Sequence, residues 1–180
     1  MANVNAPFGF RPTMRTLQGG SGSIASAHKL VGYGTALFIN DAVTHAAAGT
    51  KPTLAIDAAI TPGTTPVLGV NLIYGAASTA TDHAIVMAAG AIFQVQGDGS
   101  GATFLVAASL SKTANIALTA GNTSTKISKH SLSETSLATT NTLDLKVRGL
   151  FQSADNILGQ YARVFVTFNN LVEADQKAGI

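Results

Sequence analysis

Hydrophobic and polar positions alternate most regularly in the last third of the chain. The segment YARVFVTFN (residues 161–169) has a strict period of two, which is the pattern of a β-strand with one buried face. Its hydrophobic face carries Ala162, Val164, Val166 and Phe168. The segment LDLKVRGLF (residues 143–151) alternates in the same way, and the nine residues between the two can close a hairpin. The pattern predicts an antiparallel pair with one face in the core and the other in solvent.

Shorter hydrophobic segments precede this pair and are separated by turn signals rich in Gly, Pro, Ser and Thr. They contain many β-branched and aromatic residues, which fit a pleated surface. These strand candidates are residues 29–40, 66–74, 83–89, 91–96, 114–118 and 125–132. Only ATFLVAASLSK (residues 102–112) has the pattern of a short helix. We therefore expect an all-β fold, an antiparallel β-barrel or a jelly-roll-like sandwich.

The first 23 residues follow neither a helical nor a strand period. Pro7 and Pro12 lack amide donors, and the glycines around them leave the backbone without regular ladder partners. We expect an extended N-terminal arm at residues 1–23, a barrel or sandwich domain at 24–170 and a C-terminal tail at 171–180.

Large apolar side chains in this arm cost roughly 1.5–3 kcal/mol each when they stay in water, so the arm must dock. Two alternatives are open. The arm folds back onto its own barrel, or it crosses to a neighbouring subunit or partner, where aromatic side chains anchor it and arginines reach acidic groups. The interface residues expected in the second case are Asn5, Pro7, Phe8, Phe10, Arg11, Pro12, Met14, Arg15 and Leu17.

Composition narrows the function classes. Charged residues make up only 11% of the 180 residues, well below the quarter typical of soluble domains, so much of the surface is small, neutral or shared with a neighbour. The net charge of +2 is too small for the broad basic face that duplex DNA requires, so we expect no specific nucleic-acid partner. Arg11, Arg15 and Lys29 all precede the first acid, Asp41. This mildly basic start suits either an acidic partner surface or plain solvation.

The residues that carry chemistry are scattered. The chain has no cysteine, which excludes disulfides and zinc–thiolate sites. Its four histidines, His28, His45, His83 and His130, lack the spacing of metal ligands. Gly97 and Gly99 formally begin a dinucleotide-binding motif, but no acid follows before Ser133 to hold a ribose. We expect no cofactor, no metal, no small-molecule substrate and no enzymatic activity.

The longest apolar run, Ala84 to Phe93, is about half a membrane span, and the N-terminus lacks the apolar region of a signal peptide. We expect synthesis in a host cytoplasm and no association with a membrane.

Several segments resemble a family of viral structural proteins. They are NAPFGFRP (5–12), ALFINDAVT (36–44), VLGV (67–70), GNTSTKISKHSLSETSLATTNTLDLKVRGL (121–150) and ADNILGQYARVFVTFNN (154–170). In this order they are similar to the decoration, or cement, proteins of tailed-bacteriophage heads. The shared motifs are structural.

The resemblance implies a β-barrel or jelly-roll-like subunit, commonly a homotrimer, on the outer surface of the capsid. It would bind the major capsid protein and copies of itself where capsomers meet, and would clamp the shell against packaged DNA. Its terminal arm would correspond to residues Asn5 to Leu17. Two alternatives remain: another virion part, such as a head fibre base or a tail subunit, and a carbohydrate-binding β-sandwich. The second needs aromatic platforms for sugar rings, and the chain has no Trp and three Tyr.

Overall fold

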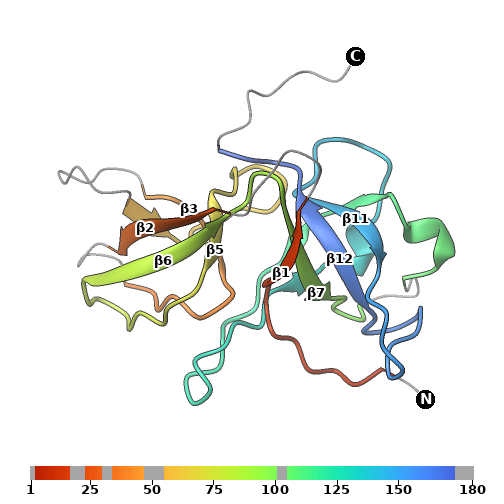
Figure 1. The fold of residues 1–180 in the computed structure, drawn as a ribbon, viewed down its shortest axis with the longest axis horizontal. Helices are drawn as coiled ribbons and strands as arrows, with labels where there is room; N and C mark the ends of the chain where they lie inside the picture. Colours follow the sequence, from red (N-terminus) through yellow and green to blue (C-terminus); the bar gives the residue numbers. More distant parts are fainter. Residues whose placement is uncertain (1–2, 17–22, 30–33, 47–54, 101–104, 173–180) are drawn as a thin grey trace.

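The computed structural model describes residues 3–16, 23–29, 34–46, 55–100 and 105–172. Strands dominate, and two short 3-10 turns complete the regular structure of this part of the chain. Figure 1 shows a barrel on one side and a larger sheet on the other. The expected all-β class is confirmed.

The larger sheet has five strands in the order β1-β7-β12-β11-β8, and all neighbours are antiparallel. Their bounds are β1 (Arg11–Thr16), β7 (Ala91–Gln96), β12 (Arg163–Phe168), β11 (Leu145–Leu150) and β8 (Thr113–Ala114). The predicted hairpin is confirmed, because Leu145 pairs with Phe168 and Leu150 with Val164. The register shifts once, between Val147 and Gly149.

Five further strands close a barrel in the order β2-β4-β3-β5-β6. They are β2 (Ile24–Lys29), β4 (Ala55–Asp57), β3 (Ala42–His45), β5 (Gly69–Asn71) and β6 (Thr81–Met87). The β2–β4 pair is parallel, whereas the other described pairs of the barrel are antiparallel. Strands β3 and β4 lie outside the strand segments predicted from the sequence, and β2 overlaps a predicted segment only at Lys29. Within candidate 29–40, the described residues make isolated bridges at Leu37 and Ile39.

The remaining elements are short. Strand β9 (Ile116–Ala117) pairs with β10 (Ser131–Leu132), and the 3-10 turns are η1 (Ala107–Ser109) and η2 (Glu134–Ser136). The described part of the segment expected to form a short helix, residues 102–112, contains the 3-10 turn η1 and no α-helix. Leu105, before this turn, is fully buried and forms an isolated antiparallel bridge with Gly159. No helix in the described residues is long and apolar enough to cross a membrane.

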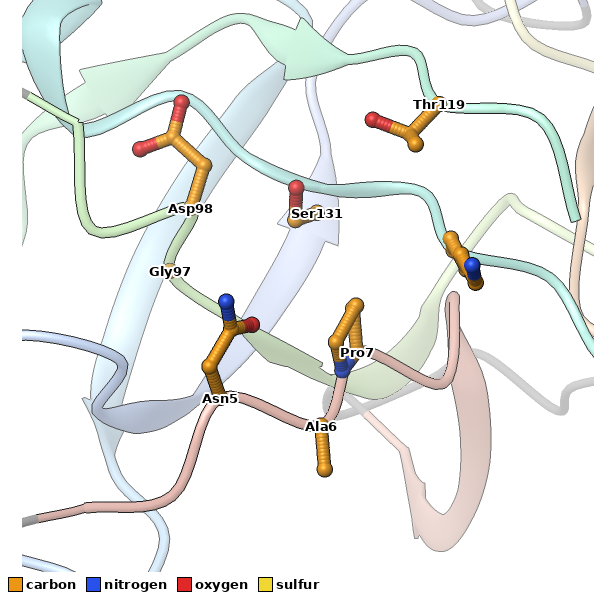
Figure 2. Close-up of a pocket in the computed structure, with 8 residues that line it drawn as sticks. Asn5, Ala6, Pro7, Gly97, Asp98, Thr119 and Ser131 are labelled. Carbon is orange, nitrogen blue, oxygen red and sulfur yellow. The ribbon is translucent and has the colours of Figure 1, made fainter.

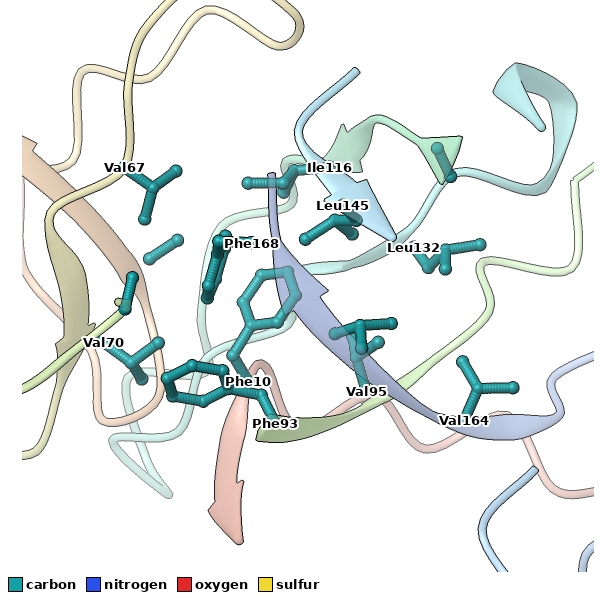
Figure 3. Packing of buried hydrophobic residues seen from close by; sticks show 14 of the residues in the cluster. Phe10, Val67, Val70, Phe93, Val95, Ile116, Leu132, Leu145, Val164 and Phe168 are labelled. Carbon is teal, nitrogen blue, oxygen red and sulfur yellow. The ribbon is translucent and has the colours of Figure 1, made fainter. Parts of the chain in front are cut away.

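The larger hydrophobic core lies between the sheet and the barrel (Figure 3). The Phe168 ring is 5.0 Å from the Phe10 ring and 5.1 Å from the Phe93 ring, measured between centroids. Barrel residues such as Val67 and Val70 pack against the same cluster. A second, smaller cluster joins residues from several barrel strands, namely Ala27, Leu37, Val43, Ile56, Leu68, Ile85 and Met87.

The N-terminal region departs from the expected arm. Residues 11–16 form β1, with Arg11 opposite Gln94 on β7, so the expectation that this region lacks ladder partners is wrong. Gly9 turns the chain with φ +72°, and a Cβ there would lie 2.4 Å from the carbonyl oxygen of Asn40. The Phe10 N–H donates to that same oxygen at 2.9 Å. Within the single chain, the described residues 9–16 thus fold back onto the same chain, and whether the N-terminal region also contacts a neighbouring subunit stays a prediction.

The expected C-terminal boundary also shifts slightly. Leu171 bridges Val67, and the Val172 N–H donates to the Val67 carbonyl at 3.1 Å. These two residues continue the folded domain beyond residue 170. The rest of the expected tail lies outside the described residues.

Candidate binding surface

Residues 3–8, here called the N-terminal segment, cross the outer surface next to strand β7. The Asn3 side chain donates to the Ile157 carbonyl at 2.8 Å and accepts from the Ile157 N–H at 3.0 Å. The Gln96 side chain donates to the Val4 carbonyl at 2.7 Å and accepts from the Ala6 N–H at 3.0 Å. Side-chain amides thus take the place of a β-ladder, and Gln96 is only 3% exposed beneath the segment.

Two pockets lie along the N-terminal segment. The first has a volume of about 520 Å³ and is shown in Figure 2. Its polar lining combines Asn5, Asp98, Thr119, Lys129 and Ser131, with one charge of each sign. The second, of about 360 Å³, is lined by Phe8, Arg11, Gln94, Asp155 and Arg163 among others. We call it the arginine groove.

Four cations project from the outer side of the five-stranded sheet. They are Arg11 on β1, Lys146 and Arg148 on β11, and Arg163 on β12. Strand alternation places them there, because intervening residues such as Val147 and Val164 are fully buried in the core. We call this surface the basic face.

Neighbouring side chains hold three of these cations. The Arg11 guanidinium lies 4.8 Å from the Phe8 ring centroid, and that of Arg163 lies 5.5 Å from the Phe151 ring centroid. Such cation–π contacts contribute about 0.5–1 kcal/mol at exposed sites. The Arg148 Nε donates to the Thr167 hydroxyl at 3.0 Å.

Among the described residues, Asp155 is the one acidic residue on the basic face, and it forms an ion pair with Arg163. A hydrogen bond from the Ser153 hydroxyl, followed by one from Arg163, holds the pKa of Asp155 below its ordinary value. Asp155 is therefore ionised at neutral pH. The other described acids lie elsewhere: Asp41, Glu134 and Asp144 are buried, Asp57 and Asp82 are on the barrel, and Asp98 lines the first pocket. The basic face thus keeps a surplus of positive charge.

Glu134 is fully buried close to Asp98, although 36 residues separate the two in the sequence. Burial and then the charge of Asp98 raise the pKa of Glu134 to about 7, against the lowering effect of the backbone N–H groups of Gly99 and Tyr161. A Cβ at Gly97 would lie 2.0 Å from a Glu134 oxygen, so a larger residue there would force the Glu134 carboxyl group to move. Paired carboxylates with separated pKa values suit acid–base chemistry, but the Glu134 carboxyl group is closed off from solvent.

A second buried pair joins Asp41 and His130, whose Oδ1 and Nε2 atoms are 3.5 Å apart. Burial raises the pKa of Asp41 and lowers the pKa of His130. The other Asp41 oxygen accepts from the Phe38 N–H at 2.7 Å, so the pair organises the loop that enters β3. Within the described ranges, no group of three or more His, Asp or Glu side chains could hold a metal ion.

The residues expected at an interface do not all lie on one surface. Asn5 and Pro7 line the first pocket, and Phe8 and Arg11 line the arginine groove. Pro12, Met14 and Arg15 belong to β1, where Pro12 is half-buried. The side chains of Met14 and Arg15, and all of Leu17, lie outside the described residues.

Phe10 does not fit its expected role as an interface residue. It is 0% exposed and packs in the core of its own chain, so it is not available as an anchor for a partner. Sequence reasoning placed Lys146, Arg148 and Arg163 on wet strand faces but did not assign them to a site. The missing information was the strand order, which brings β1, β11 and β12 into one sheet.

Comparisons of the chain with protein-family models, curated proteins and solved structures found no match.

Proposed function

We propose that this chain is a non-enzymatic structural protein of a tailed-bacteriophage head, a decoration protein that binds the outer shell between capsomers. The observation that carries the proposal is the N-terminal segment on the surface. Its Val4 is 75% exposed, and the Asn3 side chain bonds to the backbone of Ile157, which is 51% exposed. Two exposed apolar residues in segments that are bonded to each other, on a chain with only 11% charged residues, favour an interaction surface here.

The mechanism is multivalent binding. Each copy would contact the major capsid protein through this surface and would contact other copies in a homotrimer. A standard interface buries about 1,600 Å² in total. Many copies that tie adjacent capsomers together would make local detachment of the shell rare, because each contact holds its neighbours at high effective concentration.

Fractionation of the phage lysate on a density gradient tests the proposal. Quantitative mass spectrometry would measure the ratio of this chain to the major shell protein in capsid-sized particles. We expect hundreds of copies per particle. A handful of copies would instead indicate a portal, tail or fibre part, and a chain found only in the soluble fraction would overturn the proposal.

A pair of double variants locates the attachment surface. Val4→Asp with Ile157→Asp should lower particle occupancy at least tenfold, because charged groups replace the apolar contact. The matched control is Ile24→Asp with Ile73→Asp, two apolar residues on the barrel side that are 68% and 42% exposed. The control should bind like the unmodified chain. Equal losses in both double variants would contradict attachment through Val4 and Ile157.

A further inference from the structure

The basic face has a regular layout that follows from the strand register. Arg11 on β1 is opposite Gln94 on β7, and Arg163 on β12 is opposite Gln96 on the same strand. Neighbouring strands lie about 4.8 Å apart and their partners on β7 are two residues apart, so the two arginines stand on either side of β7, roughly 12 Å apart in backbone position. The arginine groove lies between them. Guanidinium groups bind carboxylates in bidentate geometry. Asp155 already pairs with Arg163 in this groove, so Arg11, which stacks on Phe8, is the arginine there that an acidic side chain from outside would reach.

The next strand extends the same surface. Arg148 on β11 is exposed and is held by its bond to Thr167, and Lys146 precedes it by two residues. The Phe151 and Phe165 rings pack edge to face, with 5.5 Å between their centroids, and contribute an aromatic pair to the basic face. Arginines fixed by hydrogen bonds or aromatic contacts lose less side-chain freedom when they bind a partner.

Charge complementarity indicates the partner. Four cations stand against the single described acid of this face, Asp155, so the complementary surface must carry several negative groups. A second copy of this chain does not supply them in its described residues. Away from the basic face, its acids with some exposure are Asp82 and the half-buried Asp57 on the barrel and the half-buried Asp98 in the first pocket, which also holds Lys129.

A nucleic acid is the weaker candidate. Tight binding to duplex DNA typically involves about 6–10 phosphate contacts, more than four cations provide. The net charge of the whole chain, +2, adds no broad field beyond the face itself.

We propose that the basic face is a docking surface for an acidic segment of a different protein, with carboxylates of that segment bound by Arg11 and Arg148, the exposed arginines on either side of the Asp155–Arg163 pair. The inference deepens the proposed function and rests on it for the identity of the partner, which would be the shell protein. The recognition chemistry itself stands on the arrangement of Arg11, Arg163, Arg148 and Lys146.

The test is fluorescence anisotropy of the full chain with a labelled hexaglutamate peptide at about 50 mM salt, below physiological ionic strength so that surface charges are less screened. Arg11→Gln with Arg148→Gln should weaken peptide binding at least tenfold, because both cations are exposed and stand on opposite sides of the face. The matched control is Lys112→Gln with Lys126→Gln, which removes the same charge from the segments before β8 and between β9 and β10. The control should change the affinity less than twofold, and thermal unfolding should show that both variants are folded.

Three outcomes would overturn the inference: no binding of hexaglutamate by the unmodified chain, equal losses in the two double variants, or tighter binding of a labelled DNA duplex that the Arg11/Arg148 variant loses. The assay needs no virus particle, so it is independent of the gradient experiment. A chain that binds particles but not the peptide would contradict only the inference. A chain that binds the peptide but is absent from particles would contradict only the proposed function.

Discussion

The five-stranded sheet and the barrel are stabilised in different ways. The sheet contributes three phenylalanine rings, Phe10, Phe93 and Phe168, to the larger core, where they contact one another. The described residues of the smaller, barrel-side cluster are aliphatic side chains and a methionine, with no aromatic ring. Because buried aromatic rings contribute the largest contact areas, we expect the sheet to unfold last and the barrel to open more readily.

The two regions also differ in how clearly the alternation of hydrophobic and polar residues predicts their strands. In the sheet, one side is core and the other is solvent, so β11 and β12 alternate clearly. The barrel wall next to the sheet is buried on both sides: Ile85 packs in the smaller core and Val86 in the larger one. A strand that is buried on both sides loses its alternation, and this is why β6 was visible only as a continuous apolar run.

The largest expected loss of stability comes from truncating one buried side chain in each of the two cores. Phe10→Ala should lower the free energy of unfolding by about 3–5 kcal/mol, because it leaves a cavity next to Phe168. Ile85→Ala should cost about 2–5 kcal/mol, with the loss concentrated in the barrel. Denaturant unfolding measures the totals, and amide hydrogen exchange locates them. If Ile85→Ala lowers protection in β7 and β12 as much as in β6, the two regions unfold as one unit and the comparison fails.

The next effect depends on pH and belongs to the sheet side. The pKa of Glu134 is raised to about 7, so the folded state binds this proton more tightly than the unfolded state does. Stability from this group is therefore present at low pH and is lost as pH rises from about 4.5 to 7. Glu134→Gln should remove that loss, and its stability relative to the unmodified chain should increase over this range by at most about 3 kcal/mol.

Urea unfolding at several pH values would measure this difference, which excludes the separate contribution of His130 because both chains share it. The control is Asp155→Asn, an exposed acid on the basic face, for which we expect a much smaller pH-dependent difference. A difference between Glu134→Gln and the unmodified chain that stays constant with pH would contradict the raised pKa.

The smallest expected changes in unfolding free energy come from two glycines, one on a barrel strand and one on a sheet strand. A Cβ at Gly69 on β5 would lie 2.5 Å from the Val86 carbonyl oxygen, so Gly69→Ala should cost about 1–3 kcal/mol through overpacking in the barrel. A Cβ at Gly149 on β11 would meet no atom within 4 Å. Gly149→Ala should change stability by less than about 1 kcal/mol, in the stabilising direction. Thermal unfolding compares the two, and equal losses would show that Gly149 is packed more tightly than the structure indicates.

The site was only partly predictable. Asn5, Pro7, Phe8 and Arg11 were selected from the sequence and do line the two pockets. Phe10 was selected on the same grounds and is a core residue, since a large apolar side chain fits a partner and its own core equally well in a sequence. Glu134 was not selected, because its neighbour Asp98 is 36 residues away in the chain.

By itself, the sequence determined the all-β class, the β11–β12 hairpin, the position of β7 and the outward direction of Lys146, Arg148 and Arg163. These features depend on local alternation and on a short connection, which one stretch of chain encodes completely. The tertiary structure decided the insertion of β1 beside β7, the parallel β2–β4 pair and the assembly of the basic face from β1, β11 and β12. The physical reason is that alternation reports which face of a strand is buried, whereas the choice of partner strand depends on long-range packing.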